Sequence, residues 1–145
     1  MQRDGAQDWS SDASVAYALL RLTMGVNIGF RGLVRIMHGT GGFAAGLLKQ
    51  FEATPLSAGL VSPYAHALPY VETVLGVLLI LGLWTRPVLV LSALMMTSLT
   101  FGTMFTENFT NAWLQLTYAG FFFLLLALRS WNLISLDGMM GGNDR

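Results

Sequence analysis

The chain contains no cysteine among its 145 residues, and this absence excludes several kinds of redox and metal chemistry. Disulfide frameworks, thiolate zinc sites, iron–sulfur clusters and dithiol relays all require thiols. There are two histidines and neither has a spaced ligand partner, so we expect no metal. No catalytic group is evident, and any redox chemistry would come from a bound cofactor or a partner protein.

Charged side chains are also scarce. They make up 11% of the residues, against about 25% in an ordinary soluble domain. Hydrophobic residues make up 54%, and the mean hydropathy is +0.57. The formal net charge is zero, which gives no electrostatic case for a nucleic-acid partner. This composition predicts a lipid bilayer as the main partner of the chain.

Four apolar stretches are long enough to cross a bilayer, which takes about 20 residues. The expected spans cover residues 14–37, 67–84, 87–105 and 112–128. Between the first two spans, Phe43, Leu47 and Phe51 recur at helical spacing and predict an amphipathic or re-entrant segment. The polar, acidic start of the chain is unlike a secretory signal, so we expect the first span to be retained. The predicted fold class is all-α, a membrane four-helix bundle forming a single domain over residues 1–145.

The distribution of basic residues predicts the orientation in the membrane. Four spans place both termini on one side, and most arginines outside the spans lie on that side. These are Arg3, Arg86, Arg129 and Arg145, against Lys49 and the border residue Arg35 on the other. Positive charge favours the cytoplasm, so we expect a multi-pass protein of the inner (cytoplasmic) membrane with both termini cytoplasmic.

Polar residues in the first span gather on one face, and they are the main candidates for a functional site. At about 100° per residue they occupy roughly one third of the helix circumference. They are Arg21, Asn27, Arg31, Arg35 and His38. Ionisable groups inside apolar spans face the protein interior, where they pair or line a pathway. A neighbouring strip of glycines predicts close approach of another helix.

Glu72 is the one acid in the second span and the expected partner of this polar face. Arg31 and Glu72 lie roughly 9 and 8 Å inside the same side, at about 1.5 Å per residue, so they are predicted to pair. Arg35 is nearer the surface and can also reach Glu72. Arg21 lies at the opposite end, where it can extend to the lipid headgroups. The candidate ligand-binding residues are therefore Asn27, Arg31, Arg35 and Glu72.

Secondary candidates are Arg21 and His38, with Gln115 and Tyr118 as a separate polar patch on the fourth span. Two or three arginines against one acid leave a positive excess, which favours an anion or a quinone carbonyl. The same cluster is also consistent with a purely structural ion pair, because such pairs are common in interiors.

Several motifs resemble those of the DoxX/DoxD family of small membrane proteins. In the first span they are Leu20-Arg21-Leu22, Gly25, Arg31-Gly32 and His38-Gly39, and in the second Pro69-Tyr70-Val71-Glu72, Gly76 and the run from Leu78 to Arg86. Later motifs are Leu99-Thr100-Phe101-Gly102 and Ser135-Leu136-Asp137-Gly138. The resemblance implies four helices and, in its quinone-linked branch, a subunit of thiosulfate:quinone oxidoreductase. It would place Arg31, Glu72 and Arg86 among the pattern residues.

Two functions follow as hypotheses. In the first, the protein is a membrane subunit of a redox complex, with quinone as its cofactor and a redox partner protein. In the second, it is a non-enzymatic membrane scaffold or assembly factor whose Arg–Glu cluster is structural. The sequence leaves open whether copies of the chain form a homo-oligomer.

Overall fold

The computed structural model describes the backbone of residues 4–140 and the side chains of residues 11–140, and every regular element in this part of the chain is a helix. Its elements are α1 (Asp4–Met37), α2 (Thr40–Phe51), α3 (Ala58–Leu81), α4 (Thr85–Phe105), α5 (Phe109–Ala127), the 3₁₀ turn η1 (Arg129–Trp131) and α6 (Leu136–Met139). Four of these helices are long and apolar enough to span a membrane. The predicted all-α four-helix membrane fold is confirmed, and the protein is a multi-pass membrane protein.

The second span begins earlier than the sequence predicts. Helix α3 begins at Ala58 rather than at residue 67, and it carries Pro63 and Pro69 inside it. Proline usually ends a helix in soluble proteins, which is why the predicted start was placed after Pro63. Membrane helices tolerate proline better, because neighbouring groups satisfy the backbone carbonyls that it leaves free. The longer α3 brings residues 58–66 into the bundle as helix.

Helices α1 and α3 form one antiparallel pair that is held together by close backbone contact. A Cβ atom added at Gly32 would lie 2.4 Å from the carbonyl oxygen of Pro69. A Cβ atom added at Gly76 would lie 2.3 Å from the Cα of Gly29. Only glycine fits at such separations, so these residues fix how closely the two helices pack. The glycine strip of the first span therefore has the role that its pattern predicts.

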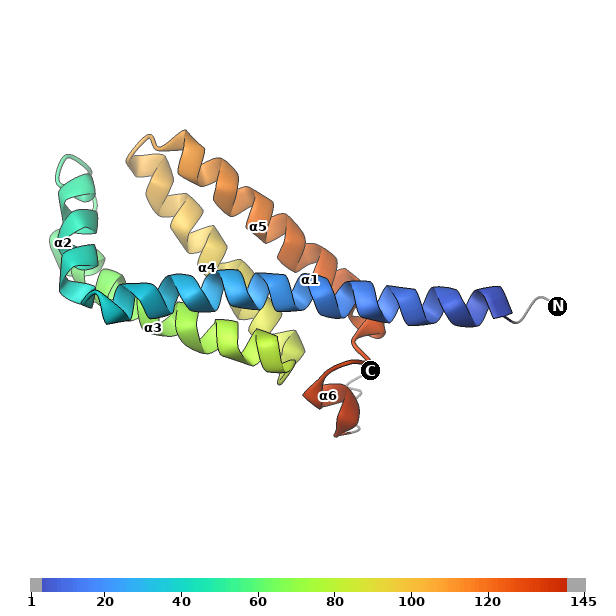
Figure 1. Cartoon of the computed structure of the whole chain (residues 1–145). Coiled ribbons are helices and arrows are strands. Elements are labelled where there is room, and N and C mark those ends of the chain that lie inside the picture. The colour runs from blue at the N-terminus through green and yellow to red at the C-terminus, as the bar shows by residue number, and fades with distance from the viewer. Residues whose placement is uncertain (1–3, 141–145) are drawn as a thin grey trace.

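Helices α4 and α5 form the second antiparallel pair, and the two pairs diverge along the bundle (Figure 1). They converge near α6 and separate toward the opposite end, where α2 lies crosswise to α1 (Figure 1). Fully buried apolar side chains fill the space where the pairs converge. The largest are Phe122, Ile28, Leu79, Leu89, Met96 and Leu125. We refer below to the end near α6 as the closed end and to the end near α2 as the open end.

A polar network ties the C-terminal segment to the closed end. Arg21 is only 5% exposed, and it donates from Nη1 to Asn132 Oδ1 at 2.7 Å and from Nη2 to the Ile134 carbonyl oxygen at 2.9 Å. Asn132 in turn donates to the hydroxyl of Thr85 at 3.0 Å. The prediction that Arg21 extends to the headgroups is wrong, because the segment after α5 folds back over it. We call Arg21, Thr85, Asn132 and Asp137 the closed-end cluster.

Gly82 makes room for this network. It has a φ of 65° at the end of α3, a backbone conformation that residues other than glycine rarely adopt. A Cβ atom here would lie 2.1 Å from Arg21 Nη1. The turn between α3 and α4 therefore needs glycine for its backbone shape and also for access of the arginine.

Candidate binding cavity

The diverging helix pairs enclose a cavity of about 680 Å³ at the open end. All five long helices contribute to its walls, from Arg31 on α1 to Tyr118 on α5. Its main polar lining residues are Arg31, Arg35, Tyr64, Glu72, Ser98, Thr103, Gln115 and Tyr118. The rest of the wall is mostly apolar. The cavity therefore has the form of a ligand site, which is commonly apolar with a few convergent polar groups.

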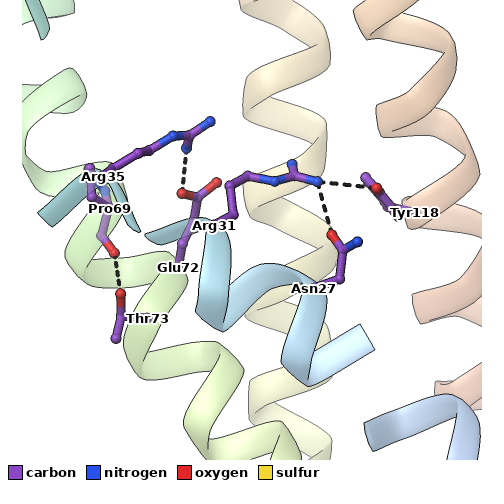
Figure 2. Close-up of polar contacts among 7 residues, drawn as sticks. All are labelled: Asn27, Arg31, Arg35, Pro69, Glu72, Thr73 and Tyr118. Carbon is purple, nitrogen blue, oxygen red and sulfur yellow. Dashed lines mark hydrogen bonds and ion pairs between the residues drawn. The ribbon is translucent and has the colours of Figure 1, made fainter. Parts of the chain in front are cut away.

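Arg35, not Arg31, forms the ion pair with Glu72 (Figure 2). Arg35 Nη1 lies 2.5 Å from Glu72 Oε2, and the carboxylate side chain is 1% exposed. The guanidinium also stacks on Phe43, with 4.2 Å between Cζ and the ring centroid. The predicted Arg31–Glu72 pair is thus corrected. Depth along the helix allowed both arginines, and the aromatic ring on α2 holds Arg35 in place over the acid.

Arg31 binds neutral partners instead. Its Nη2 donates to Asn27 Oδ1 at 2.9 Å and to the Tyr118 hydroxyl at 3.1 Å (Figure 2). Its Cζ lies 5.1 Å from the centre of the same tyrosine ring. No acidic side chain within residues 11–140 pairs directly with Arg31. We call Arg31, Arg35, Glu72 and Tyr118 the open-end cluster.

The second polar patch belongs to the same cavity. Gln115 and Tyr118, predicted as a separate patch on α5, both line the cavity, and Tyr118 contacts Arg31 directly. The two patches were predicted separately because residue spacing within single helices does not indicate how α1 and α5 face each other. The Gln115 side chain contacts the Thr103 hydroxyl on α4 at 2.9 Å.

Other predicted candidates lie away from the cavity wall. Asn27 is exposed and does not line the cavity, but it holds Arg31 from one turn earlier on α1. His38 is exposed at the end of α1 and is also outside the lining. Among residues 11–140 no group of three His, Asp or Glu side chains is close enough to hold a metal ion.

Tyr64 and Ser98 line the cavity and were not predicted. Their hydroxyl oxygens lie 2.7 Å apart across α3 and α4. Because Ser98 donates to the Met95 carbonyl oxygen, Tyr64 is the donor to Ser98. Tyr64 was overlooked because residues 58–66 were expected to precede the second span. Its position four residues before Leu68 and eight before Glu72, all on one helical face, was the available signal.

The predicted apolar face of α2 covers the open end of the cavity. Phe43, Leu47 and Phe51 follow one another at four-residue spacing, and all three line the cavity. Gly102 on α4 leaves space for the ring of Phe51, since a Cβ atom there would lie 3.2 Å from its Cζ. A cationic and hydrogen-bonding region within an apolar enclosure can bind an amphipathic molecule by its polar head. The described lining carries no nucleophile paired with a base.

One protein family matches more than half of the chain. A family model described as methylamine utilisation protein MauE matches residues 13–112. The match includes Arg31, Arg35 and Glu72, and it ends before Gln115, Tyr118 and the C-terminal segment. It overturns the expected membership of the DoxX/DoxD family, whose resemblance rested on short apolar motifs that small membrane proteins can share. No curated protein and no solved structure matches the chain.

Proposed function

The chain belongs to the MauE family of methylamine utilisation proteins, and from that premise we propose that it is a membrane-embedded accessory protein of that process. In this proposal the open-end cavity binds a molecule with an apolar body and an oxygen-bearing head, of which a quinone is the type. The observation that carries the proposal is the cavity itself, with Arg31 on its wall and no acid paired to that arginine.

The residues that line the cavity fit a quinone. Arg31, Gln115 and Tyr118 are hydrogen-bond donors that would hold its carbonyl oxygens, and the apolar surfaces of α2, α3 and α4 would contact the ring and tail. When bound, a quinone would supply electron-carrier chemistry that no side chain of this cysteine-free chain offers. The role of Arg35 would be to neutralise Glu72, so that Arg31 remains available to the ligand.

A partner protein and an orientation complete the proposal. Electrons would pass to or from a redox partner, because the described lining has no redox-active group of its own.

We place the protein in the inner membrane with both termini cytoplasmic. Arg86 and Arg129 lie at the closed end, and Lys49 lies at the open end on α2, which is the asymmetry expected when the closed end faces the cytoplasm. Arg3 and Arg145, used in the same prediction, lie outside the described residues.

One observation favours a second candidate function, a non-enzymatic scaffold. The Arg35–Glu72 pair joins α1 to α3, the two helices that also share the glycine contacts. A pair in that place can set the register of two helices without any ligand. The two functions predict different results when a larger side chain fills the cavity: a ligand site loses its ligand, whereas a scaffold is unaffected.

The test fills part of the cavity with a larger apolar side chain and leaves every charged residue unchanged. Leu114 and Leu116 are both exposed residues of α5, and only Leu114 lines the cavity. The parent, Leu114→Trp and the matched control Leu116→Trp are purified in mild detergent. Each is then assayed for co-purified quinone per protein, for binding of a decyl-benzoquinone and for thermal stability.

The proposal predicts that the parent and Leu116→Trp bind the decyl-benzoquinone, and that Leu114→Trp binds it at least about tenfold more weakly, a difference of about 1.4 kcal/mol. Thermal stability of the two variants should stay close to that of the parent. If the parent neither carries nor takes up quinone, or if both tryptophan variants bind as the parent does, the quinone proposal is wrong and the scaffold function is favoured.

A further inference from the structure

We infer that the open-end cavity selects ligands whose polar head is an anionic oxygen, and that Arg31 is the residue that makes this selection. The inference rests on the proposed function, because it names the charge state of the molecule that the cavity binds. The chemistry is an ionised oxygen acid on an apolar body, whether the oxygen belongs to an enolate of a ring or to a carboxylate.

The balance of charges in the cavity is the first argument. Its ionised lining residues are Arg31, Arg35 and Glu72, so two positive charges face one negative charge and a single positive charge remains. Arg35 is matched by direct contact with Glu72. The excess is therefore localised on Arg31, whose two hydrogen-bond partners are both neutral. An unmatched charge in the membrane interior is costly, and an anionic ligand would offset that cost.

The hydrogen-bonding groups around Arg31 form the second argument. A guanidinium has five N–H groups, and the two hydrogen bonds of Arg31 both involve Nη2. Its Nε and Nη1 make no hydrogen bond within the described residues and are not buried, so both remain accessible. The Tyr118 hydroxyl accepts from Arg31, and its own proton has no acceptor among the described residues. Both groups thus offer donors to the same place.

Gln115 adds a third donor one turn away on α5. Its amide contacts Thr103, and a side-chain amide carries two N–H groups. Whichever way the amide is oriented, at least one of its N–H groups is free of Thr103. Three donors on this side of the cavity favour an oxygen head without a proton, because such a head can accept hydrogen bonds from all of them.

The experiment compares ligand pairs that differ only in charge. The first pair is an alkylated 2-hydroxynaphthoquinone, which is an anion at neutral pH, and its neutral methyl ether. The second pair is a long-chain fatty acid and its methyl ester. Affinities for the detergent-solubilised full chain are measured by quenching of tryptophan fluorescence and by thermal shift. The parent is compared with Arg31→Gln and with Arg31→Lys, which keeps the charge.

We expect the parent to bind the anion of at least one pair at least about tenfold more tightly than its neutral partner, a difference of about 1.4 kcal/mol. In Arg31→Gln the anion should fall to the affinity of the neutral partner, whose own affinity changes little. In Arg31→Lys the preference should persist. A preference seen only with the naphthoquinone pair indicates a ring head, and one seen only with the fatty acid pair indicates a carboxylate.

The outcomes separate this inference from the proposed function. If the parent binds both members of the naphthoquinone pair equally and the fatty acid no better than its ester, the cavity binds ligand without charge selection and the inference fails alone. If the parent binds none of the four probes, the proposed function fails and the inference with it. If Arg31→Gln keeps the preference of the parent, Arg31 is not the selecting residue. Should Arg31→Gln not fold, the ratio in the parent decides whether the cavity selects anions, and Arg31→Met, which removes the charge and keeps a long side chain, decides whether Arg31 selects them.

Discussion

The two arginine clusters of α1 lie about 15 Å apart along the helix, at a rise of about 1.5 Å per residue, and they differ in what surrounds them. At the closed end, Arg21 is covered by the C-terminal segment, and both of its terminal nitrogens bind protein oxygens. Its Nε and the nearby Tyr17 hydroxyl are buried without partners. At the open end, Arg31 is half-buried, binds only neutral side chains and lines a cavity.

This contrast indicates which arginine maintains the fold and which is available to a ligand. A buried charge whose strongest donors are occupied and whose surroundings are closed has no route to another molecule. An accessible charged group beside a cavity can be reached by a ligand. Both residues were equivalent members of one polar face in the sequence, so the difference arises from the segments that reach them: the C-terminal turns at one end and α2 with α5 at the other.

The largest expected effect comes from removing the closed-end arginine. In Arg21→Ala the Asn132 amide oxygen and the Ile134 carbonyl oxygen lose charged donors, at about 1–3 kcal/mol for each group left unsatisfied, so we expect a loss near 4 kcal/mol. In Arg31→Ala we expect about 1 kcal/mol, because its partners Asn27 and Tyr118 are accessible to other donors. Unfolding free energies from SDS titration in mixed micelles provide the measurement.

If Arg31→Ala lost more unfolding free energy than Arg21→Ala, the comparison would be wrong, and the open-end arginine would be the one that maintains the fold. Equal losses would show that burial of the two arginines does not distinguish their roles. Circular dichroism of both variants before titration is the control that each starts from the folded helical state.

An intermediate effect is expected for the ion pair within the open-end cluster. Arg35→Gln leaves a carboxylate that is 1% exposed without its partner, and we expect a loss of about 2 kcal/mol, below the usual 3–5 kcal/mol because Arg31 is near. Adding Glu72→Gln removes the stranded charge, so the double variant should recover to within about 1 kcal/mol of the parent. The same SDS titration measures the cycle, and a double variant less stable than Arg35→Gln would argue against a direct pair.

Much of the fold could be predicted because apolar length and polar spacing are local properties. Four spans, the amphipathic α2 and the close glycine contacts all follow from patterns within single segments. The start of α3 was misplaced because Pro63 was taken to precede the helix, as proline does in many soluble proteins, whereas membrane helices tolerate it. The divergence of the two helix pairs, which creates the cavity, depends on how different segments pack, and no single segment encodes it.

The candidate site shows the same division between local and long-range information. The helical face that carries Arg31 and Arg35 could be read from spacing, and so could the depth of Glu72. Which arginine meets the acid could not, because the choice depends on Phe43 from α2 and on Tyr118 from α5. The burial of Arg21 depends on residues more than a hundred positions later in the chain, which spacing within α1 cannot indicate.

The smallest expected effect concerns Asp137, which ties α6 to the start of α4. Its carboxylate accepts the N–H of Trp84 at 2.8 Å and the N–H of Thr85 at 2.7 Å. Partial burial raises the pKa of Asp137, but hydrogen bonds from Thr85 and from Trp84, with Arg21 nearby, outweigh it and hold the pKa below the ordinary 3.8. A lowered pKa in the folded state means that the carboxylate stabilises the fold above the ordinary value. That contribution is lost as pH falls through the lowered pKa.

We therefore expect the closed end to loosen in acid below about pH 4 while the open end is unaffected by this residue. Because Asp137 is partly exposed, the change should stay under about 1 kcal/mol. Trp84 adjoins the carboxylate, so its fluorescence, read with Trp9, Trp113 and Trp131 replaced by phenylalanine, should shift with pH in the parent and not in Asp137→Asn. Asparagine keeps one acceptor oxygen and the side-chain size, which makes it a matched control. An identical acid transition in both proteins would show that another group controls the closed end, and that Asp137 is dispensable to the contrast between the two clusters.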